Sequence, residues 1–314
     1  MKKLRFVSAQ PATDYYKWQV EVMINNFMSM GVNPNDIDIV CWKVNGVIPE
    51  DWRKLANKYP ARFFFYNDTR ENKHYISSIR PNILKQHFKE HSYLSNDAIF
   101  YHDCDILFTK NPSEWITSDM LQDNNWYGSD VRWYISHDYI IGKGEDILDK
   151  MCDIMEIPKQ MVKENELNCI GAQYLMKHID ADYWDWVERK SDRLFKEITD
   201  LNNQKVSLDK SYHTLQIWCS DMWAVLWKGW LMGKKTIPHE NFNFSWGTSS
   251  EKDYYGMNIM HNAGVTSDSL GLFYKAKYTN RLPFDSEEPR SGTASWHYWS
   301  WIQKTKEKSC LISG

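Results

Sequence analysis

Apolar and polar positions are arranged along the first hundred residues as short apolar runs separated by longer amphipathic stretches. Runs of about four to eight apolar residues are typical of buried strands, and apolar positions three or four residues apart are typical of helices. Strands are therefore expected at residues 4–9, 36–43, 61–68 and 97–103, and helices at 14–30, 49–59 and 77–91. This alternation predicts an α/β fold, in which a parallel sheet is joined by right-handed crossovers and covered by helices.

The second half of the chain has a more mixed pattern. Its expected elements are a strand within 124–133, a helix at 144–155, a loop and strand at 168–178, a long amphipathic helix at 180–201, an apolar helix at 220–233, and a short strand at 256–265 that runs into a His-Asn turn. Repeats and long linkers are missing from the pattern. We therefore expect one integrated domain.

Composition excludes several classes of protein. The 314 residues carry a net charge of −3, so no global basic field points to nucleic acid or to an anionic membrane surface. Apolar runs are too short for a membrane span, and the N-terminal sequence lacks the apolar region of a signal peptide. The six cysteines form no CxxC pair, which favours reduced thiols in a cytosol.

Within residues 96–115, Asp103 and Asp105 lie between two apolar runs, Ala98–Tyr101 and Ile106–Phe108. Burying a carboxylate is costly unless it is paired or holds a metal. In an extended segment residues i and i+2 point the same way, so both carboxylates could converge on one Mg²⁺ or Mn²⁺ ion. The end of a strand in an open α/β sheet is also where ligands bind. The alternative is a pair of turn aspartates at a strand end.

Four further residues could contribute to such a site. His261 follows a short apolar strand and could be an extra metal ligand or a histidine bonded to backbone. Asp221 opens an apolar helix, either as a first-turn acid or as a carboxylate in a cleft. Lys275 could meet phosphate charge or belong to a solvated basic loop, and Arg80 lies near the expected ligand edge. The chain has no glycine-rich phosphate loop, so a diphosphate would need the metal and lysines.

Five segments, taken in order, resemble the GT-A class of nucleotide-sugar glycosyltransferases. They are similar to the group containing plant hydroxyproline O-arabinosyltransferases, peptidyl-serine galactosyltransferases and their viral and phage relatives, and they read "YYKWQVEVMINNF", "IFYHDCDILF", "GAQYLMKHIDADYWDWV", "WCSDMWAVLW" and "IMHNAGV…FYKAKY". The resemblance implies a GT-A (Rossmann-like) fold with a mixed, mainly parallel sheet in a single domain, 1–314. Residues 1–105 would form the nucleotide-binding half, and 106–314 the acceptor half with a C-terminal metal and phosphate loop.

The resemblance also implies roles for individual residues. The implied metal ligands are Asp103, Asp105 and His261, with Asp105 the more direct of the two aspartates. The implied contacts to the sugar nucleotide are Ala9, Gln10, Pro11, Arg80, Asp103, Gly171, Ala172 and Lys275, and the implied catalytic residues are Asp221 and Gln173. Gly171, Ala172 and Gln173 would form a loop beneath the donor sugar. Cys104 departs from the pattern, because the plant enzymes carry an apolar residue or proline there, and its side chain is expected to point away from the metal.

The activity that the resemblance implies is metal-dependent transfer of a sugar, a pentose such as arabinose or a hexose, from a UDP-sugar to a hydroxyl with retention of configuration. Mn²⁺ or Mg²⁺ would be the cofactor. The acceptor is open between protein hydroxyls, glycans, small molecules and hydroxymethylated pyrimidines of phage DNA. Segments 227–235 and 274–281 mix lysine with aromatic residues, as backbone-binding grooves do, whereas the net acidity argues against tight duplex binding.

Two other functions stay open: a UDP-sugar-binding protein without transfer activity, and a metal-dependent hydrolase of nucleotide sugars. A cytoplasmic location, the host cytoplasm for a viral protein, is expected, without a membrane partner. The sequence does not predict the oligomeric state.

Overall fold

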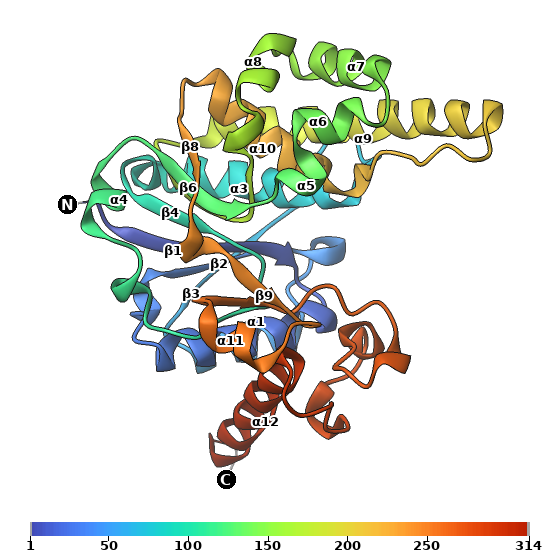
Figure 1. The fold of residues 1–314 in the computed structure, drawn as a ribbon. Coiled ribbons are helices and arrows are strands. Elements are labelled where there is room, and N and C mark those ends of the chain that lie inside the picture. The colour runs from blue at the N-terminus through green and yellow to red at the C-terminus, as the bar shows by residue number, and fades with distance from the viewer. Residues whose placement is uncertain (1, 313–314) are drawn as a thin grey trace. The chain divides into compact units, whose positions relative to one another are not determined.

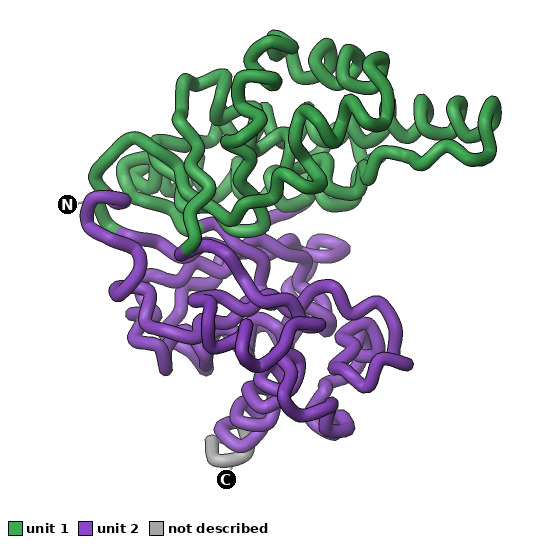
Figure 2. Tube along the Cα trace, in the orientation of Figure 1, with its two compact units in different colours: residues 1–3, 68–100, 122–240 green, residues 4–67, 101–121, 241–314 purple. Residues whose placement is uncertain are grey.

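A computed structural model describes residues 2–312, with side chains through residue 308. The chain divides into two compact units (Figure 2). Unit 1 comprises residues 1–3, 68–100 and 122–240, and unit 2 comprises residues 4–67, 101–121 and 241–314. Each unit is thus assembled from segments far apart in sequence. A single integrated domain with halves at 1–105 and 106–314 stays a prediction.

The N-terminal part of unit 2 has the predicted strand–helix alternation (Figure 1). Its elements are β1(Leu4–Pro11), α1(Asp14–Ser29), β2(Ile37–Trp42), α2(Glu50–Lys58) and β3(Arg62–Tyr66). Strand β2 pairs in parallel with both β1 and β3. Gly31 follows the end of α1 with a φ of +85°, a conformation that glycine adopts without steric cost, and so ends the helix as expected.

A second, three-stranded sheet in unit 2 combines the middle and the end of the chain. Its order is β5-β10-β9, formed by β5(Ile106–Phe108), β10(Ile259–His261) and β9(Phe244–Trp246). Strand β10 is antiparallel to β5 and parallel to β9. Helices α11(Glu251–Gly256) and α12(Ala294–Ile312) complete the C-terminal part. A core that includes Trp18, Leu107, Met260 and Tyr298, all with no exposed surface, joins α1 to this sheet and to α12.

Unit 1 contains the remaining strands and a group of packed helices. The strands are β4(Ala98–Tyr101), whose last residue belongs to unit 2, β6(Trp126–Asp130), β7(Ile170–Lys177) and β8(Thr236–Pro238). Strand β6 is antiparallel to β7 and parallel to β8. The long helix α9(Ala181–Leu208) contacts α3(Ile79–Glu90), α7(Glu145–Met155) and α10(Ser220–Leu231). The shorter helices are α5(Arg132–Ile135), α6(His137–Ile141) and α8(Lys159–Glu164), whereas α4(Ser118–Gln122) belongs to unit 2 except for its last residue.

Hydrogen bonding orders seven strands as β3-β2-β1-β4-β7-β6-β8. The α/β prediction is confirmed, because three of the described strand pairs in this sheet are parallel and one is antiparallel. Two expectations were wrong in extent: the long helix continues to Leu208, and the fourth strand ends at Tyr101. Strands β5, β8 and β9 and helix α12 were not predicted. A three-residue strand is too short to show a periodic pattern.

No helix within residues 2–312 is long and apolar enough to cross a membrane. Five cysteines, Cys41, Cys104, Cys152, Cys169 and Cys219, are buried and free, in agreement with reduced thiols. The side chain of Cys310 lies outside the described part of the chain.

Candidate metal centre

Strand pairing in unit 2 places Asp105 beside His261. Ile106 is paired with His261 in the antiparallel ladder of β5 and β10, and the Asn262 backbone N–H donates to the Asp105 carbonyl oxygen at 2.9 Å. Both strands are apolar and buried, which fixes their register and therefore the position of the residues at their ends. Asp103 lies in the connection between β4 and β5. The prediction that both aspartates belong to an extended strand was wrong, because a turn at Cys104 and Asp105 interrupts it.

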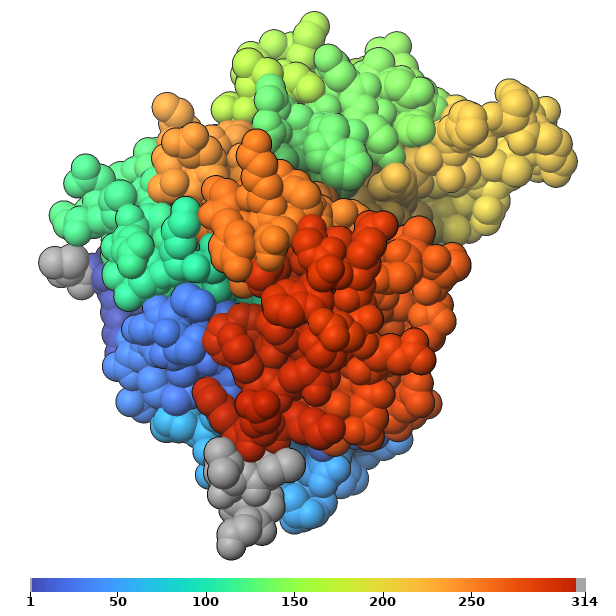
Figure 3. All heavy atoms as spheres, turned by 60° about the horizontal axis from the view of Figure 1, so that its bottom comes forward, coloured from blue at the N-terminus to red at the C-terminus, as the bar shows by residue number. Residues whose placement is uncertain are grey.

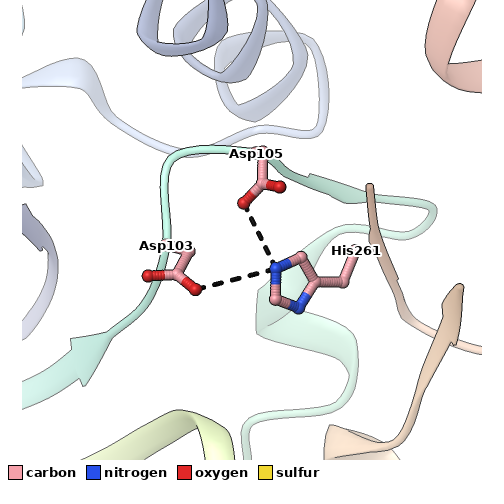
Figure 4. A group of neighbouring side chains, drawn as sticks. All are labelled: Asp103, Asp105 and His261. Atoms are coloured by element: carbon pink, nitrogen blue, oxygen red, sulfur yellow. Dashed lines mark ion pairs between the residues drawn. The ribbon is translucent and has the colours of Figure 1, made fainter. Parts of the chain in front are cut away.

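The two carboxylates nevertheless converge on one side of the histidine ring (Figure 4). His261 Nε2 lies 3.2 Å from Asp105 Oδ1 and 3.7 Å from Asp103 Oδ2. The side chains of Asp105 and His261 are 6% and 10% exposed, whereas that of Asp103 is 38% exposed. The group is therefore anchored in the protein on two sides and open to solvent on the third.

This donor set fits a divalent cation. Two carboxylates and a neutral imidazole suit Mn²⁺ or Mg²⁺, and one ligand atom from each residue lies within 4.8 Å of the others. Ligands about 2.1 Å from one Mg²⁺ ion lie at most about 4.2 Å apart, and both distances from His261 Nε2 meet that limit. The other ring nitrogen, Nδ1, is buried and makes no hydrogen bond within the described residues, so the ring presents Nε2 to the carboxylates.

Lys275 gives the centre a positive charge from within the protein. It belongs to the 3₁₀ helix η10(Lys275–Tyr278), and its Nζ forms a close ion pair with Asp105 Oδ2. Burial alone would raise the pKa of Asp105, but Lys275 and His261 outweigh it and hold that pKa well below its usual range. Burial opposes protonation of Lys275, yet Asp105 raises its pKa above the ordinary value. Asp105 is thus a carboxylate held by an imidazole at one oxygen and by an ammonium group at the other.

His102 and two tyrosines, none of them singled out in the sequence, surround this group. The His102 Nδ1–H donates to the Asp103 carbonyl at 2.8 Å, and burial lowers the pKa of His102 to about 4, so the ring is neutral. Tyr298 is fully buried, and the Asp105 carboxylate adds to the effect of burial in raising its pKa. Tyr15, in the first turn of α1, lies within electrostatic reach of Lys275. Only His102 had a sequence signal, its place directly before Asp103.

The residues expected to face the nucleotide lie at the carboxyl end of β1, in the same unit as the metal centre. Ala9 and Gln10 are buried and Pro11 is partly exposed. Gln10 Nε2 donates to the Val40 carbonyl at 3.3 Å, while Gln10 Oε1 is buried and accepts no hydrogen bond among the described residues. Pro11 is therefore the most accessible of the three, and their nucleotide contacts stay a prediction.

Arg80 and Asp221, both in unit 1, form an ion pair. Arg80 Nη2 lies 2.6 Å from Asp221 Oδ2, and the Tyr75 hydroxyl lies 2.8 Å from Asp221 Oδ1. Asp221 is in the first turn of α10, as the sequence indicated, but Cys219 occupies the N-cap position. The carboxylate is thus held by a cation and a hydroxyl, an arrangement compatible with orienting a substrate hydroxyl.

Gly171, Ala172 and Gln173 were expected in a loop and instead belong to strand β7. The ladder between β6 and β7 shifts register at Gly128 and Ser129, and Ala172 adopts a φ of +62°, so the strand bulges there. Gln173 is fully buried and its Nε2 donates to Ser129 Oγ at 2.7 Å. A Cβ on Gly171 would lie 2.5 Å from Met222 Cε, so this glycine permits close approach to the start of α10.

The two segments that mix lysine with aromatic residues bury or pair several of these side chains. In residues 227–235, Trp227 and Trp230 are buried in α10. In residues 274–281, Lys275 faces Asp105 and Lys277 is paired with Asp268. Several of their rings and lysines are thus already engaged within the protein, and the interpretation of both segments as backbone-binding grooves stays a prediction.

Neither a protein-family model nor a curated protein matches this chain. Several solved structures of glycosyltransferases resemble it. The crystal structure of galactosyltransferase LgtC in complex with donor and acceptor sugar analogues has 13% identity over 96% of this chain and 95% of its own, with a TM-score of 0.43. Mouse xyloside xylosyltransferase 1, in its apo form, has 9% identity over 84% of this chain and 99% of its own, with a TM-score of 0.40.

Glucosyl-3-phosphoglycerate synthase from Mycobacterium tuberculosis, in complex with Mn²⁺, uridine diphosphate and glucosyl-3-phosphoglycerate, has 11% identity over 76% of this chain and 82% of its own, with a TM-score of 0.35. Because all three TM-scores lie below 0.5, the function of this chain rests on the geometry of its own side chains.

Proposed function

We propose that the protein is a metal-dependent glycosyltransferase of the GT-A type that moves a sugar from a UDP-sugar to an acceptor hydroxyl. The observation that carries the proposal is the convergence of Asp103, Asp105 and His261, with Lys275 as an adjoining cation. Two carboxylates, an imidazole and a lysine at one place match the charge pattern of a metal-bound diphosphate. The residues that would hold the ion, Asp103, Asp105 and His261, come from two distant segments of unit 2.

A bound divalent cation would neutralise the diphosphate and so make it a better leaving group. The protein's own residues do the rest. Lys275 places an ammonium group where it can contact a phosphate oxygen. The His102 ring holds the Asp103 backbone through its Nδ1–H, and the Asn262 N–H holds that of Asp105, so both ligands are fixed before the nucleotide arrives. Pre-organised charges of this kind stabilise developing negative charge without reorganisation.

The finer parts of the proposal come from the resemblance. The transferred sugar would be a pentose such as arabinose or a hexose, and its configuration would be retained. Arg80, Gly171 and Ala172 would face the sugar nucleotide, and Asp221 and Gln173 would orient the reacting groups. The acceptor hydroxyl could belong to a hydroxymethylated pyrimidine in phage DNA, a protein or a glycan.

A thermal-shift experiment with UDP, with and without Mn²⁺, tests the proposal. Stabilisation at a ligand concentration of roughly 100 Kd amounts to about 2.7 kcal/mol, which for a chain of this length raises the Tm by about 4 °C. We expect that shift only when metal and UDP are both present, and we expect Asp105→Asn to remove it. Indifference of the wild type to UDP in the presence of Mn²⁺ would refute the proposal.

Asp51→Asn is the matched control, because Asp51 is an aspartate of the same unit whose side chain is 56% exposed. It should keep the full shift. Release of UDP from a panel of UDP-sugars, with and without acceptors, separates the alternatives: equal release in both cases identifies a hydrolase, and binding without release identifies a binding protein. Nuclear magnetic resonance of the product reports whether the anomeric configuration is retained.

A further inference from the structure

A pocket of about 320 Å³ lies on the C-terminal part of unit 2. Its lining comes from Asp268 to Pro289, a segment that contains η9(Asp268–Leu270), η10 and η11(Pro283–Asp285). In the space-filling view this part of the chain, coloured orange-red to red, forms a continuous stretch of surface (Figure 3). The volume falls within the range of about 300–1,000 Å³ that is usual for small-molecule sites. A pocket in unit 1 beside Lys85 and Asp185, about 90 Å³, falls short of it.

Three aromatic residues, Phe273, Tyr274 and Tyr278, are among those that line this pocket. Phe273 and Tyr278 are buried and stack with ring centroids 5.4 Å apart and planes 6° from parallel. The guanidinium of Arg281 lies 5.0 Å from the Tyr278 centroid. Tyr274, which is partly exposed, adds a third ring to the lining. The stacked pair supports the pocket from below its surface, and the more exposed Tyr274 ring offers a flat apolar face that can pack against the C–H face of a sugar ring or against a planar ligand.

The rim is polar and carries a net negative charge. Four carboxylates outnumber two cations in its lining: Asp268, Asp285, Glu287 and Glu288 against Lys277 and Arg281. Lys277 is already paired with Asp268, and Lys306 lies 3.0 Å from Asp285. Such a rim repels a polyanion such as a nucleic-acid backbone. Carboxylates that accept hydrogen bonds and a guanidinium that donates them match the hydroxyl groups of a neutral sugar instead.

The walls are fixed by hydrogen bonds. The Arg290 N–H donates to the Gly271 carbonyl at 2.8 Å, and the Phe273 N–H donates to Ser295 Oγ at 2.6 Å. From α12, Trp296 Nε1–H donates to Glu288 Oε1 at 2.6 Å. The pocket is therefore formed before any ligand arrives, which lowers the entropy cost of binding.

We propose that this pocket binds a neutral saccharide and is the acceptor-sugar subsite of the transferase, an inference that rests on the proposed function. The 3₁₀ helix η10 connects it to the metal centre. Lys275 on this turn reaches Asp105, whereas Tyr278 on the same turn lines the pocket. The pocket and the phosphate-facing lysine thus share one short element, so an acceptor sugar bound here is held next to the donor machinery of unit 2.

Saturation-transfer nuclear magnetic resonance on the full chain tests the proposal with methyl glycosides of glucose, galactose, mannose, xylose and arabinose. We expect at least one glycoside to receive saturation from the wild type and to bind at least tenfold more weakly to Tyr274→Ala. Tyr255→Ala is the control, because Tyr255 is a tyrosine of the same unit that is 60% exposed and lies outside the pocket. Thermal melting confirms that both variants are folded.

Two results would overturn the proposal: no glycoside binds to the wild type, or Tyr274→Ala binds the glycosides as the wild type does. The proposal would also be overturned if a single-stranded DNA oligonucleotide bound instead of the glycosides and if Tyr274→Ala weakened the binding of that oligonucleotide. With the binding glycoside as acceptor, Tyr274→Ala should raise the acceptor KM about tenfold and leave the donor KM unchanged. UDP binding to the wild type in the presence of Mn²⁺ is measured in parallel. If UDP does not bind, the proposed glycosyltransferase function fails, whereas the glycoside measurement still reports whether the pocket binds a saccharide.

Discussion

Asp105 is the residue on which the charges of the metal centre meet. One of its carboxylate oxygens lies 3.2 Å from His261 Nε2, and the other is paired with Lys275. A cation that binds between Asp105 and His261 must therefore share the carboxylate with an ammonium group already present. The same lysine can transfer its contact to a phosphate once a nucleotide is bound, so metal and nucleotide should favour each other's binding.

Replacement of Lys275 by glutamine separates these two roles. We expect Lys275→Gln to bind Mn²⁺ alone about tenfold more tightly than the wild type, because the competing ammonium is gone. UDP binding in the presence of Mn²⁺ should weaken about tenfold, since a hydrogen bond to a charged phosphate is worth about 1.5–3 kcal/mol. Electron paramagnetic resonance of free Mn²⁺ and calorimetry with UDP measure the two effects.

Lys277→Gln is the matched control, because Lys277 lies two residues further along η10 and pairs with Asp268 instead. It should change neither affinity. If Lys275→Gln left Mn²⁺ binding unchanged, the lysine would not compete with the metal, and its ion pair would be structural.

At the residue scale, the chemistry of Asp103, Asp105, His261 and Lys275 could be predicted because carboxylate, imidazole and ammonium groups stand out in apolar sequence. Their distances could not. His261 follows Asp105 by 156 positions, and only the pairing of β5 with β10 brings them together. The partnership of Lys275 with Asp105 was hidden too, since nothing local to the sequence says which way a loop lysine turns.

At the scale of elements, Arg70 fixes the segment that leads into α3. It is buried, and Nε and Nη2 each lie 3.0 Å from a carboxylate oxygen of Asp68. Its Nη1 donates to the carbonyls of Tyr75 and Ile76 at 3.1 and 3.2 Å. The Asp68–Arg70 pair thus holds the start of the 3₁₀ helix η3(Ile76–Ser78), directly after Tyr75 and shortly before Arg80.

This pair makes the stability of the protein depend on acid pH. Burial raises the pKa of Asp68, but hydrogen bonds from Arg70 outweigh it and lower that pKa to about 2. In the unfolded chain the carboxyl titrates near its ordinary pKa of 3.8, so the unfolded state binds more protons between these two pH values. The stabilisation, about 2 kcal/mol, is therefore complete above about pH 4 and is lost as the pH falls toward 2.

Urea unfolding of the wild type and Asp68→Asn between pH 2 and 7 measures this contribution. We expect the variant to be less stable by at least about 2 kcal/mol at pH 7, with the difference shrinking below about pH 4. A difference that stayed constant down to pH 2 would show that the carboxylate charge is not what stabilises the segment.

Helix α10 packs closely on strand β6 through Gly229. A Cβ there would lie 2.6 Å from Cζ3 of Trp126, a fully buried ring whose Nε1–H donates to the Lys177 carbonyl at 3.0 Å and so cannot easily move. Alanine would gain about 1 kcal/mol in helix propensity but lose about 1–3 kcal/mol to overpacking. We expect Gly229→Ala to lower the free energy of unfolding by up to about 2 kcal/mol, measured by chemical denaturation.

Gly256→Ala in α11 is the comparison, because a Cβ at that position would have no atom within 4 Å. Its effect should stay within about 0.5 kcal/mol. Equal effects of the two substitutions would mean that the contact with Trp126 does not govern the packing of α10.

The elements themselves were predictable where the pattern was long. The strands and helices of residues 4–90 follow directly from apolar runs and spacing. Strands β5, β9 and β10 have three residues each, and their role depends on pairing across the chain, which no local pattern reveals. The bulge at Ala172 was missed for a similar reason: an alanine carries no sign that it will adopt a positive φ.

At the scale of the whole molecule, the five cysteines whose side chains the structure describes are buried and unpaired. Cys41, Cys104, Cys152, Cys169 and Cys219 are all buried, and burial raises the pKa of each, to about 11 for Cys152. A thiol reacts as the thiolate, so these groups are doubly protected, by their inaccessibility and by their protonation at neutral pH.

Titration with a disulfide reagent at pH 8 tests this arrangement across both units at once. We expect none of these five thiols to react rapidly in the native protein, and all six cysteines of the sequence to react after unfolding in guanidinium without reductant. Fewer than six equivalents after unfolding would reveal a disulfide and contradict the reduced state. Two or more rapid equivalents in the native protein would mean that at least one buried thiol becomes accessible by local opening, and mass mapping of the labelled peptides would identify it.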